Sequence, residues 1–277
     1  MKKVLKKILP GFIIDLYLWG RLNKDEKHIQ RELKRLKKTE RFQVGYTDIL
    51  GSESKLMYVD SLSFSFIYNE IFVNQIYQFL SSKTNPYIID AGANIGLGLI
   101  YFKSIYPNSE IIAFEPDEKV FKALEYNVSS LQLKNITLVK KALWDKVTEL
   151  NFYSEGADGG RLANEQDTAQ IIKIQTTVLS DYLKERKVDL LKIDIEGAEL
   201  SVLRESRNYL KNVENIFVEY HSFKNSPQNL AEFISILEDE GFRIIIHRIG
   251  VFSSQPFVKI EEYNGMDLQL NIYGIRV

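Results

Sequence analysis

Apolar and polar residues follow a regular pattern from about residue 86 onward. Short continuous apolar runs are separated by longer segments whose apolar positions recur at helical spacing. The runs predict strands at 87–90, 110–115, 136–140, 190–194, 215–220, 242–248 and 268–276, and the segments between them predict helices at 95–106, 117–131, 198–205 and 230–240. Strands that alternate with helices of this length predict an α/β fold with a largely parallel sheet that is covered by helices on both faces.

The chain before this regular part has a different character. Residues 23–40 are highly charged and their few apolar residues recur at helical spacing, so we expect a mostly exposed helix. Residues 42–68 alternate apolar and polar positions and predict short strands, and residues 69–81 predict a helix that leads into the regular part. We therefore divide the chain into an N-terminal extension, 1–68, and a main domain, 69–277.

An excursion interrupts the regular part after its third strand. Residues 150–153 and 171–178 predict two further strands, and the polar, glycine-containing residues 154–170 lie between them. A polar connection of this composition is typical of the tip of a hairpin.

The first twenty residues, MKKVLKKILPGFIIDLYLWG, begin with lysines and continue with apolar residues, as a signal peptide does. Pro10, Gly11 and Asp15 interrupt the apolar stretch, which is too short to predict a transmembrane helix, and no small-residue cleavage site follows. We expect this segment to be retained, either as a short helix at a membrane surface or as a helix docked on the domain or on a partner subunit.

Charge is unevenly distributed along the chain. Residues 1–41 contain 13 Lys and Arg against 5 Asp and Glu, whereas the remainder contains 23 against 32. A basic end on an acidic domain predicts contact with an anionic membrane surface, a polyanion or another subunit. We expect a cytoplasmic protein that contacts the inner face of the membrane peripherally through residues 1–41. The acidic main domain argues against nucleic acid as a partner.

The chain has no cysteine, which excludes disulfides and thiolate chemistry, including thiolate metal sites. Its three histidines are His28, His221 and His247, which are too few for a histidine-rich metal site.

The run DAGANIG, Asp90–Gly96, joins a predicted strand to a predicted helix. In an open parallel sheet, ligands bind beyond the carboxyl ends of the strands. Gly92 and Gly96 permit a positive φ and a close approach to a ligand, and Asn94 is one of the few other residues that tolerate the left-handed region. A dinucleotide fingerprint that begins at Gly92 would require glycines at positions 94 and 97, where this chain has Asn94 and Leu97.

Two acidic residues refine this prediction. Asp90, two residues before the first glycine, suits a ligand with a positively charged amino acid group and suits a pyrophosphate poorly. Glu115 ends the second predicted strand, where an acid is placed to bind the diol of a ribose. The loop and this acid together predict a site for a nucleoside cofactor.

Five stretches together resemble the FkbM family of S-adenosylmethionine-dependent methyltransferases: IIDAGANIGLGLIYF (88–102), IIAFEPDEKVFKALEYNV (111–128), TTVLSDYL (176–183), VDLLKIDIEGAELSVL (188–203) and FVEYH (217–221). The resemblance covers about half of the chain, and KIDIEGAE is its most specific run. It implies a class I methyltransferase fold: a doubly wound, mostly parallel, seven-stranded Rossmann-like sheet with an antiparallel last strand. The S-adenosylmethionine site that it implies comprises Asp90, Gly92, Ala93, Asn94, Gly96, Glu115, Pro116, Ala142 and Leu143.

The methyl acceptor should meet the cofactor at the ends of the fourth and fifth strands. The fourth strand ends KIDIEG, and in an extended chain Lys192, Asp194 and Glu196 share one side. Charged side chains at the mouth of a buried strand must pair with one another or act on a substrate. We predict catalytic roles for Asp194 and Glu196. Alternatively, one of these acids caps the helix that starts near Gly197, and Lys192 is its ion-pair partner.

The fifth strand ends Glu219-Tyr220-His221, and we predict that His221 is a catalytic base, with Glu219 orienting its ring or contacting the acceptor. A capping or surface histidine is the alternative interpretation. In a second mechanism, Asp194, Glu196 and His221 bind a divalent ion that lowers the pKa of the acceptor hydroxyl. The sequence favours the metal-free site, because carboxylates and one histidine also describe a base site.

The favoured function is O-methylation of a hydroxyl on a sugar, glycan or glycolipid precursor, in keeping with the family resemblance. The alternative is a non-catalytic partner or scaffold that retains the methyltransferase fold, in which the basic terminus makes the essential contact. The intact loop and the charged strand ends argue against that alternative. A nucleic-acid methyltransferase is disfavoured, because the sequence shows no basic groove.

Overall fold

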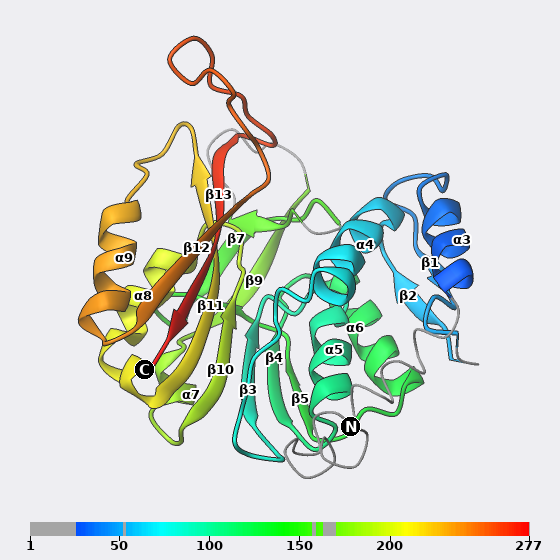
Figure 1. The fold of residues 1–277 in the computed structure, drawn as a ribbon, viewed down its shortest axis with the longest axis horizontal. Coiled ribbons are helices and arrows are strands. Elements are labelled where there is room, and N and C mark those ends of the chain that lie inside the picture. Colours follow the sequence, from blue (N-terminus) through cyan, green and yellow to red (C-terminus); the bar gives the residue numbers. More distant parts are fainter. Residues whose placement is uncertain (1–25, 52–53, 157–158, 163–169, 277) are drawn as a thin grey trace, which may run out of the picture.

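The computed structural model describes residues 26–51, 54–156, 159–162 and 170–276. Within these residues, the centre of the fold is a seven-stranded sheet (Figure 1). Its strands, in spatial order, are β12 (Arg243–Ile249), β13 (Met266–Ile275), β11 (Val213–Phe223), β10 (Val188–Ile193), β3 (Tyr87–Ala91), β4 (Glu110–Phe114) and β5 (Ile136–Val139). β13 is antiparallel to both of its neighbours, and the pairs from β11 to β5 are parallel. The predicted sheet, including its antiparallel last strand, is confirmed.

Helices cover both faces of this sheet. Every residue of β3 and β10 is buried, as expected for apolar runs in the middle of a parallel sheet. One face packs against α5 (Leu97–Ile105) and α6 (Glu118–Ser130), and the other packs against α8 (Glu199–Ser206) and α9 (Leu230–Asp239). The short helices α7 (Ser180–Leu183) and η2 (Arg207–Asn212) join the second layer. The arrangement confirms the predicted doubly wound fold.

The described part of the N-terminal extension packs on the face that α5 and α6 cover (Figure 1). Its elements are α3 (Glu26–Leu36), the antiparallel strands β1 (Gly45–Thr47) and β2 (Leu56–Tyr58), and α4 (Ser61–Tyr68). α3 confirms the helix predicted within 23–40, and it buries Leu33 and Leu36. The helix predicted within the first twenty residues lies outside the described residues, and the division of the chain at residue 68 stays a prediction.

The prediction of strands throughout 42–68 is wrong for the last part of that range, which is α4. Asp60 caps this helix by accepting a hydrogen bond from a backbone N–H in its first turn. Phe64 and Tyr68, one turn apart, bury stacked rings against the core. Three serines of α4, Ser61, Ser63 and Ser65, are buried as well. The Ser and Phe alternation that suggested a strand therefore belongs to a helix that is buried on more than one side.

The helix predicted over 69–81 is also wrong in part. The π-helix η1 (Asn69–Val73) follows α4 directly, and residues 74–86 contain turns but no regular secondary structure. Gln75 has a φ of 55°, in the left-handed region, which ends the helix. Tyr77 is nevertheless buried, and its ring lies 4.9 Å from that of Phe217 in β11. The apolar residues of this segment therefore contribute to the core without forming a helix.

The excursion forms a second, smaller sheet in the order β6-β9-β7-β8. Its strands are β6 (Ala142–Leu143), β9 (Ile171–Thr177), β7 (Glu149–Tyr153) and β8 (Arg161–Leu162). The two predicted strands correspond to β7 and β9, which pair antiparallel, while most of the predicted tip lies outside the described residues. None of the described helices is long and apolar enough to cross a membrane.

Candidate active site

A cavity of about 570 Å³ lies at the carboxyl ends of β3, β4, β10 and β11. This is the edge of the sheet at which the sequence predicts the site. The predicted site residues that line the cavity are Asp90, Gly92, Ala93, Asn94, Glu115, Pro116, Ala142, Leu143, Asp194 and Glu196. Two predicted site residues, Gly96 and His221, lie next to the cavity without lining it.

The loop between β3 and α5 has the conformation that its glycines and asparagine predict. Gly92 has a φ of 87°, and a Cβ there would lie 1.8 Å from the backbone oxygen of Asp194 in the neighbouring chain segment. Only glycine therefore lets the ends of β3 and β10 approach so closely. Asn94 has a φ of 49°, and its Oδ1 accepts a hydrogen bond from the Ile95 N–H at 2.7 Å. The asparagine thus replaces glycine in a left-handed position.

Gly96 has a packing role. It precedes α5 with a φ of 91°, and a Cβ there would lie 2.7 Å from Cδ1 of Leu124 in α6. The residue therefore brings the start of α5 close to α6 and shapes the cavity from behind.

Glu115 follows β4 and is buried against the loop. Its Oε2 accepts a hydrogen bond from the Asn94 N–H at 3.0 Å, and its Oε1 accepts one from the Asp117 N–H at 2.9 Å. Burial, with a contribution from the charge of Asp117, raises the pKa of Glu115 to about 8, although the two backbone N–H groups oppose the shift. The carboxyl group stands where the sequence predicts the acid that binds a diol.

A buried ion-pair network joins the loop to the end of β10. The Lys192 Nζ lies 3.2 Å from Asp90 Oδ1 and 3.4 Å from Asp194 Oδ2, and it donates a hydrogen bond to the Gly92 carbonyl at 2.5 Å. Burial raises the pKa of Asp90, and the charge of Lys192 opposes that shift. Burial disfavours the charge on Lys192, but Asp90 and Asp194 outweigh it and raise its pKa. Lys192 is therefore an ion-pair partner of Asp194, as the alternative interpretation of the sequence predicts.

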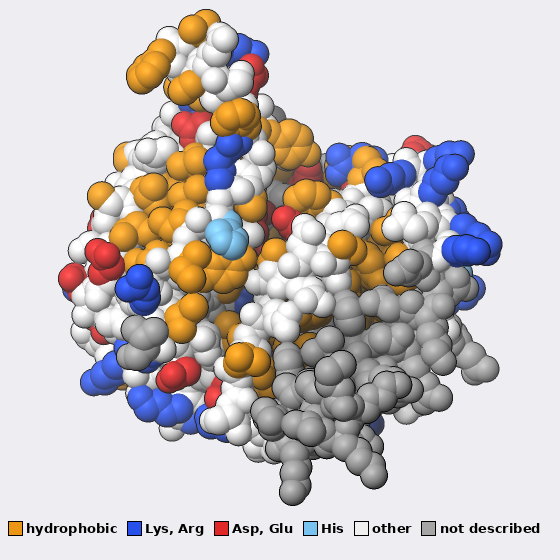
Figure 2. All heavy atoms as spheres, in the orientation of Figure 1, with side chains coloured by type: hydrophobic (Ala, Val, Ile, Leu, Met, Phe, Trp, Pro, Cys, Tyr) orange, Lys and Arg blue, Asp and Glu red, His pale blue; other side chains and the backbone are white. Residues whose placement is uncertain are grey.

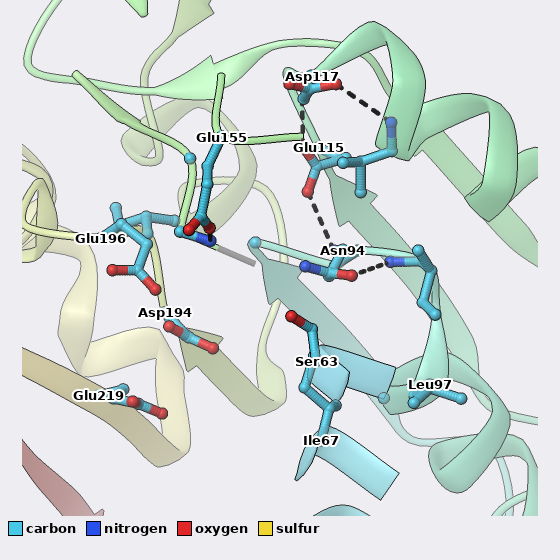
Figure 3. Close-up of a pocket in the computed structure, with 18 of the residues that line it drawn as sticks. Ser63, Ile67, Asn94, Leu97, Glu115, Asp117, Glu155, Asp194, Glu196 and Glu219 are labelled. Atoms are coloured by element: carbon cyan, nitrogen blue, oxygen red, sulfur yellow. Dashed lines mark hydrogen bonds between the residues drawn. The ribbon is translucent and has the colours of Figure 1, made fainter. Parts of the chain in front are cut away.

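The chain turns away from the extended conformation directly after β10. Glu196 has a φ of 53° and Gly197 a φ of 97°, so the strand-like alternation assumed for Lys192, Asp194 and Glu196 does not extend to the third residue. The carboxylates of Asp194, Glu196 and Glu219 still point into one space (Figure 3). Burial, together with the charge of Asp194, raises the pKa of Glu196 to about 8, and the charge of His221 opposes this shift. Burial also raises the pKa of Glu219.

The imidazole of His221 is enclosed beside these carboxylates. Its Nδ1 lies 2.9 Å from Oε1 of Glu199, and its Nε2 lies 3.3 Å from Oε1 of Glu219 and 3.7 Å from Oε2 of Glu196. Burial disfavours the charged ring, but these acids outweigh it and raise the pKa of His221 well above its usual range. The role predicted for His221 stays a prediction.

Glu199 is a residue that sequence reasoning missed. It is buried in the first turn of α8, and its Oε1 accepts hydrogen bonds from the Gly197 N–H at 2.9 Å and the Ile195 N–H at 3.3 Å besides facing His221. It therefore fixes both the turn after β10 and the orientation of the imidazole. An acid just after a glycine turn, at the start of a helix, was the signal that could have identified it.

Further walls of the cavity come from parts of the chain for which the sequence predicts no site. α4 and η1 contribute one side, and the end of β12, the start of β13 and the connection between them contribute another. The residues are Leu62, Phe66, Ile67, Glu70 and Ile71 on the first side, and Ile249, Val251, Tyr263, Met266 and Gln269 on the second. These walls leave room for a second, partly apolar ligand beside the loop.

The sequence profile of the methyltransferase FkbM domain matches residues 90–244, more than half of the chain. The chain belongs to the FkbM methyltransferase family. A relative named Methyltransferase 1, from Beauveria bassiana, is 30% identical over 68% of this chain and 84% of its own length. The 31-O-demethyl-FK506 methyltransferase FkbM of Streptomyces tacrolimicus is 25% identical over 74% of this chain and 91% of its own. The 2-O-methyltransferase NoeI of Sinorhizobium fredii is 26% identical over 55% and 68%.

Membership of the FkbM family confirms the resemblance seen in the sequence, and it makes the protein a methyltransferase whose cofactor is S-adenosylmethionine. The cavity residues fit that cofactor. The loop residues Gly92 and Asn94 line the cavity, Glu115 presents a buried carboxyl for the ribose diol, and Ala142 and Leu143 offer an apolar surface for a base. When bound, S-adenosylmethionine supplies a methyl group on a sulfonium that is a good leaving group.

Proposed function

We propose that this FkbM-family methyltransferase methylates a hydroxyl group of a sugar, glycan or glycolipid precursor. The observation that supports this most is the acidic side of the cavity, where Asp194, Glu196 and Glu219 stand beside the loop (Figure 3). Carboxylates accept the hydrogen bonds that hydroxyl groups donate, and they repel polyanions such as nucleic acids. Two of the relatives are named as O-methyltransferases, which agrees with a hydroxyl acceptor.

In the proposed reaction the carboxylates have different tasks. Asp194, held by Lys192, binds and orients the acceptor hydroxyl. Glu196 accepts the hydroxyl proton in its carboxylate form, and because its pKa is about 8, this form becomes more abundant as the pH rises through 8. Tyr77 and the apolar walls exclude water from the reacting groups. Glu199 keeps the turn that carries Glu196 in place through its two backbone hydrogen bonds.

Comparative mass spectrometry of cells with and without the gene tests this proposal. We expect glycan or glycolipid species that are heavier by one methyl-for-hydrogen replacement in cells that contain the gene. Cells supplied with an Asp194→Asn chain in place of the natural one should lack these species. A mass difference confined to peptides or nucleic acids would refute the proposed acceptor class and leave the methyltransferase assignment standing.

A further inference from the structure

The acidic side of the cavity contains three side chains whose ligand atoms come close together. A carboxylate oxygen of Asp194, a carboxylate oxygen of Glu219 and a ring nitrogen of His221 all lie within 4.8 Å of one another. These residues come from the ends of the adjacent strands β10 and β11. Ligand atoms around a small divalent cation, at about 2.1 Å from it, are up to about 4.2 Å apart. The widest of these spacings must therefore shorten by about half an ångström or more for all three atoms to share one coordination sphere.

The buried histidine independently points to a ligand at this place. The Nδ1 of His221 faces Glu199, which leaves Nε2 directed at Glu219 and Glu196. The His221 side chain has no exposed surface, and within the described part of the chain its Nε2 makes no hydrogen bond. Buried polar atoms in folded proteins nearly always have a partner. Nε2 is therefore aimed into the carboxylate cluster, where the ion-pair contact with Oε1 of Glu219, at 3.3 Å, is not a well-formed hydrogen bond.

The contact of His221 with Glu199 also resembles the contact that metal-binding histidines make through their second ring nitrogen. In such sites a carboxylate commonly accepts a hydrogen bond from the ring nitrogen that does not touch the metal, and it fixes the ring. Glu199 is itself held by two backbone N–H groups, so the ring is fixed before any ligand arrives. The carboxylates of Glu196, Glu199 and Glu219 surround one imidazole, while Lys192 pairs with Asp194, so acids still outnumber bases around Nε2. This excess favours a bound cation.

We propose that Asp194, Glu219 and Nε2 of His221 bind a divalent cation such as Mn²⁺ or Mg²⁺, which takes the place of the proton that Nε2 otherwise holds. Carboxylate-rich sites with an open side suit these ions. The role of the cation, unlike its binding, rests on the proposed function. In that function the ion contacts the acceptor oxygen and lowers the pKa of the acceptor hydroxyl group. This set contains Glu219, whereas the set suggested by the sequence contained Glu196 in its place.

Titration with Mn²⁺, followed by the paramagnetic resonance signal of the free ion, tests the cation site. The full chain is first treated with a chelator, and no cofactor or acceptor is added. We expect one Mn²⁺ per chain, with an affinity that falls about tenfold or more in Asp194→Asn and in Glu219→Gln. Glu155→Gln, which alters a carboxylate on another side of the same cavity, should bind Mn²⁺ as the natural chain does. Thermal unfolding confirms that each variant is folded.

Two results would overturn the cation site. One is the absence of Mn²⁺ binding to the natural chain at millimolar concentration. The other is equal binding by all three variants and the natural chain, which would mean an adventitious ion only. Because this titration needs neither cofactor nor acceptor, its failure is distinct from a failure of the proposed acceptor class, which the mass spectrometry detects.

Discussion

Replacing Lys192 by methionine is expected to lower the free energy of unfolding by about 3–5 kcal/mol. The lysine side chain is 4% exposed and lies between Asp90, 1% exposed, and Asp194. Without it, a buried carboxylate and the Gly92 carbonyl lose their partner, and each then carries an uncompensated desolvation cost. The same variant should also weaken binding of S-adenosylmethionine, because the network joins the cofactor loop to β10. Urea denaturation followed by circular dichroism measures the change in stability.

Lys83→Met provides a matched control for that experiment. Lys83 also pairs with an aspartate, Asp189, at 2.9 Å, but its side chain is 49% exposed. Asp189 keeps two other partners, the Ser81 hydroxyl and the Tyr87 N–H, when the lysine is removed. We expect this variant to lose about 1 kcal/mol or less. Equal losses in the two variants would show that the buried network has no special structural importance.

Changing Asp194 to asparagine is expected to lower kcat by about 10²- to 10⁴-fold. The amide is nearly isosteric, but it has lost the charge that pairs with Lys192 and that the proposed mechanism uses to orient the acceptor hydroxyl. The cofactor affinity should change much less, because Glu115 and the loop, which are the predicted cofactor contacts, are untouched. Formation of S-adenosylhomocysteine with acceptor fractions from cells that lack the gene measures turnover, and calorimetry measures cofactor binding.

The same chemical change at an exposed aspartate is the control. Asp181, on the surface helix α7, pairs with Lys184 and is about half exposed, so Asp181→Asn should retain the natural turnover. Undiminished turnover in Asp194→Asn would show that this carboxylate has no part in catalysis. A parallel loss of cofactor affinity would instead assign Asp194 to the cofactor site.

Much of the fold could be predicted because local pattern and burial agree in the main domain. β3 and β10 are continuous apolar runs, and both are fully buried in the middle of the sheet. α4 was predicted wrongly because its serines are buried together with its aromatic rings, which removes the usual contrast between an apolar and a polar face. Where tertiary packing decides the conformation of a segment, the apolar and polar pattern of its sequence alone does not predict that conformation.

The conformation of the loop between β3 and α5 could be predicted because one short segment contains it. Gly92 and Asn94 are neighbours in the loop, and their positive φ values follow from their residue types. The acceptor half is assembled from distant segments. The contacts of His221 with Glu199 and Glu219 depend on how β10, α8 and β11 meet, which spacing along the chain does not specify.

The cavity beside Glu115 should bind S-adenosylmethionine, and the pKa of that residue determines the pH at which this binding is tested. Because burial raises the pKa to about 8, most Glu115 side chains are protonated at neutral pH and become carboxylates as the pH rises through 8. Ribose hydroxyls donate hydrogen bonds to the carboxylate form, so cofactor affinity should increase with pH and level off above 8. A titration at pH 8.5 therefore measures binding to the ionised site.

Calorimetric titration of S-adenosylmethionine into the full chain at pH 8.5 tests whether the cavity binds the cofactor. We predict micromolar binding by the natural chain, and equal binding by Glu118→Ala, because Glu118 is an exposed acid that does not line the cavity. Glu115→Ala should bind about 10- to 150-fold more weakly, the loss expected for hydrogen bonds to a charged group. Equal affinity in all three proteins would contradict the cofactor site, and no binding by the natural chain would favour a scaffold that retains the fold.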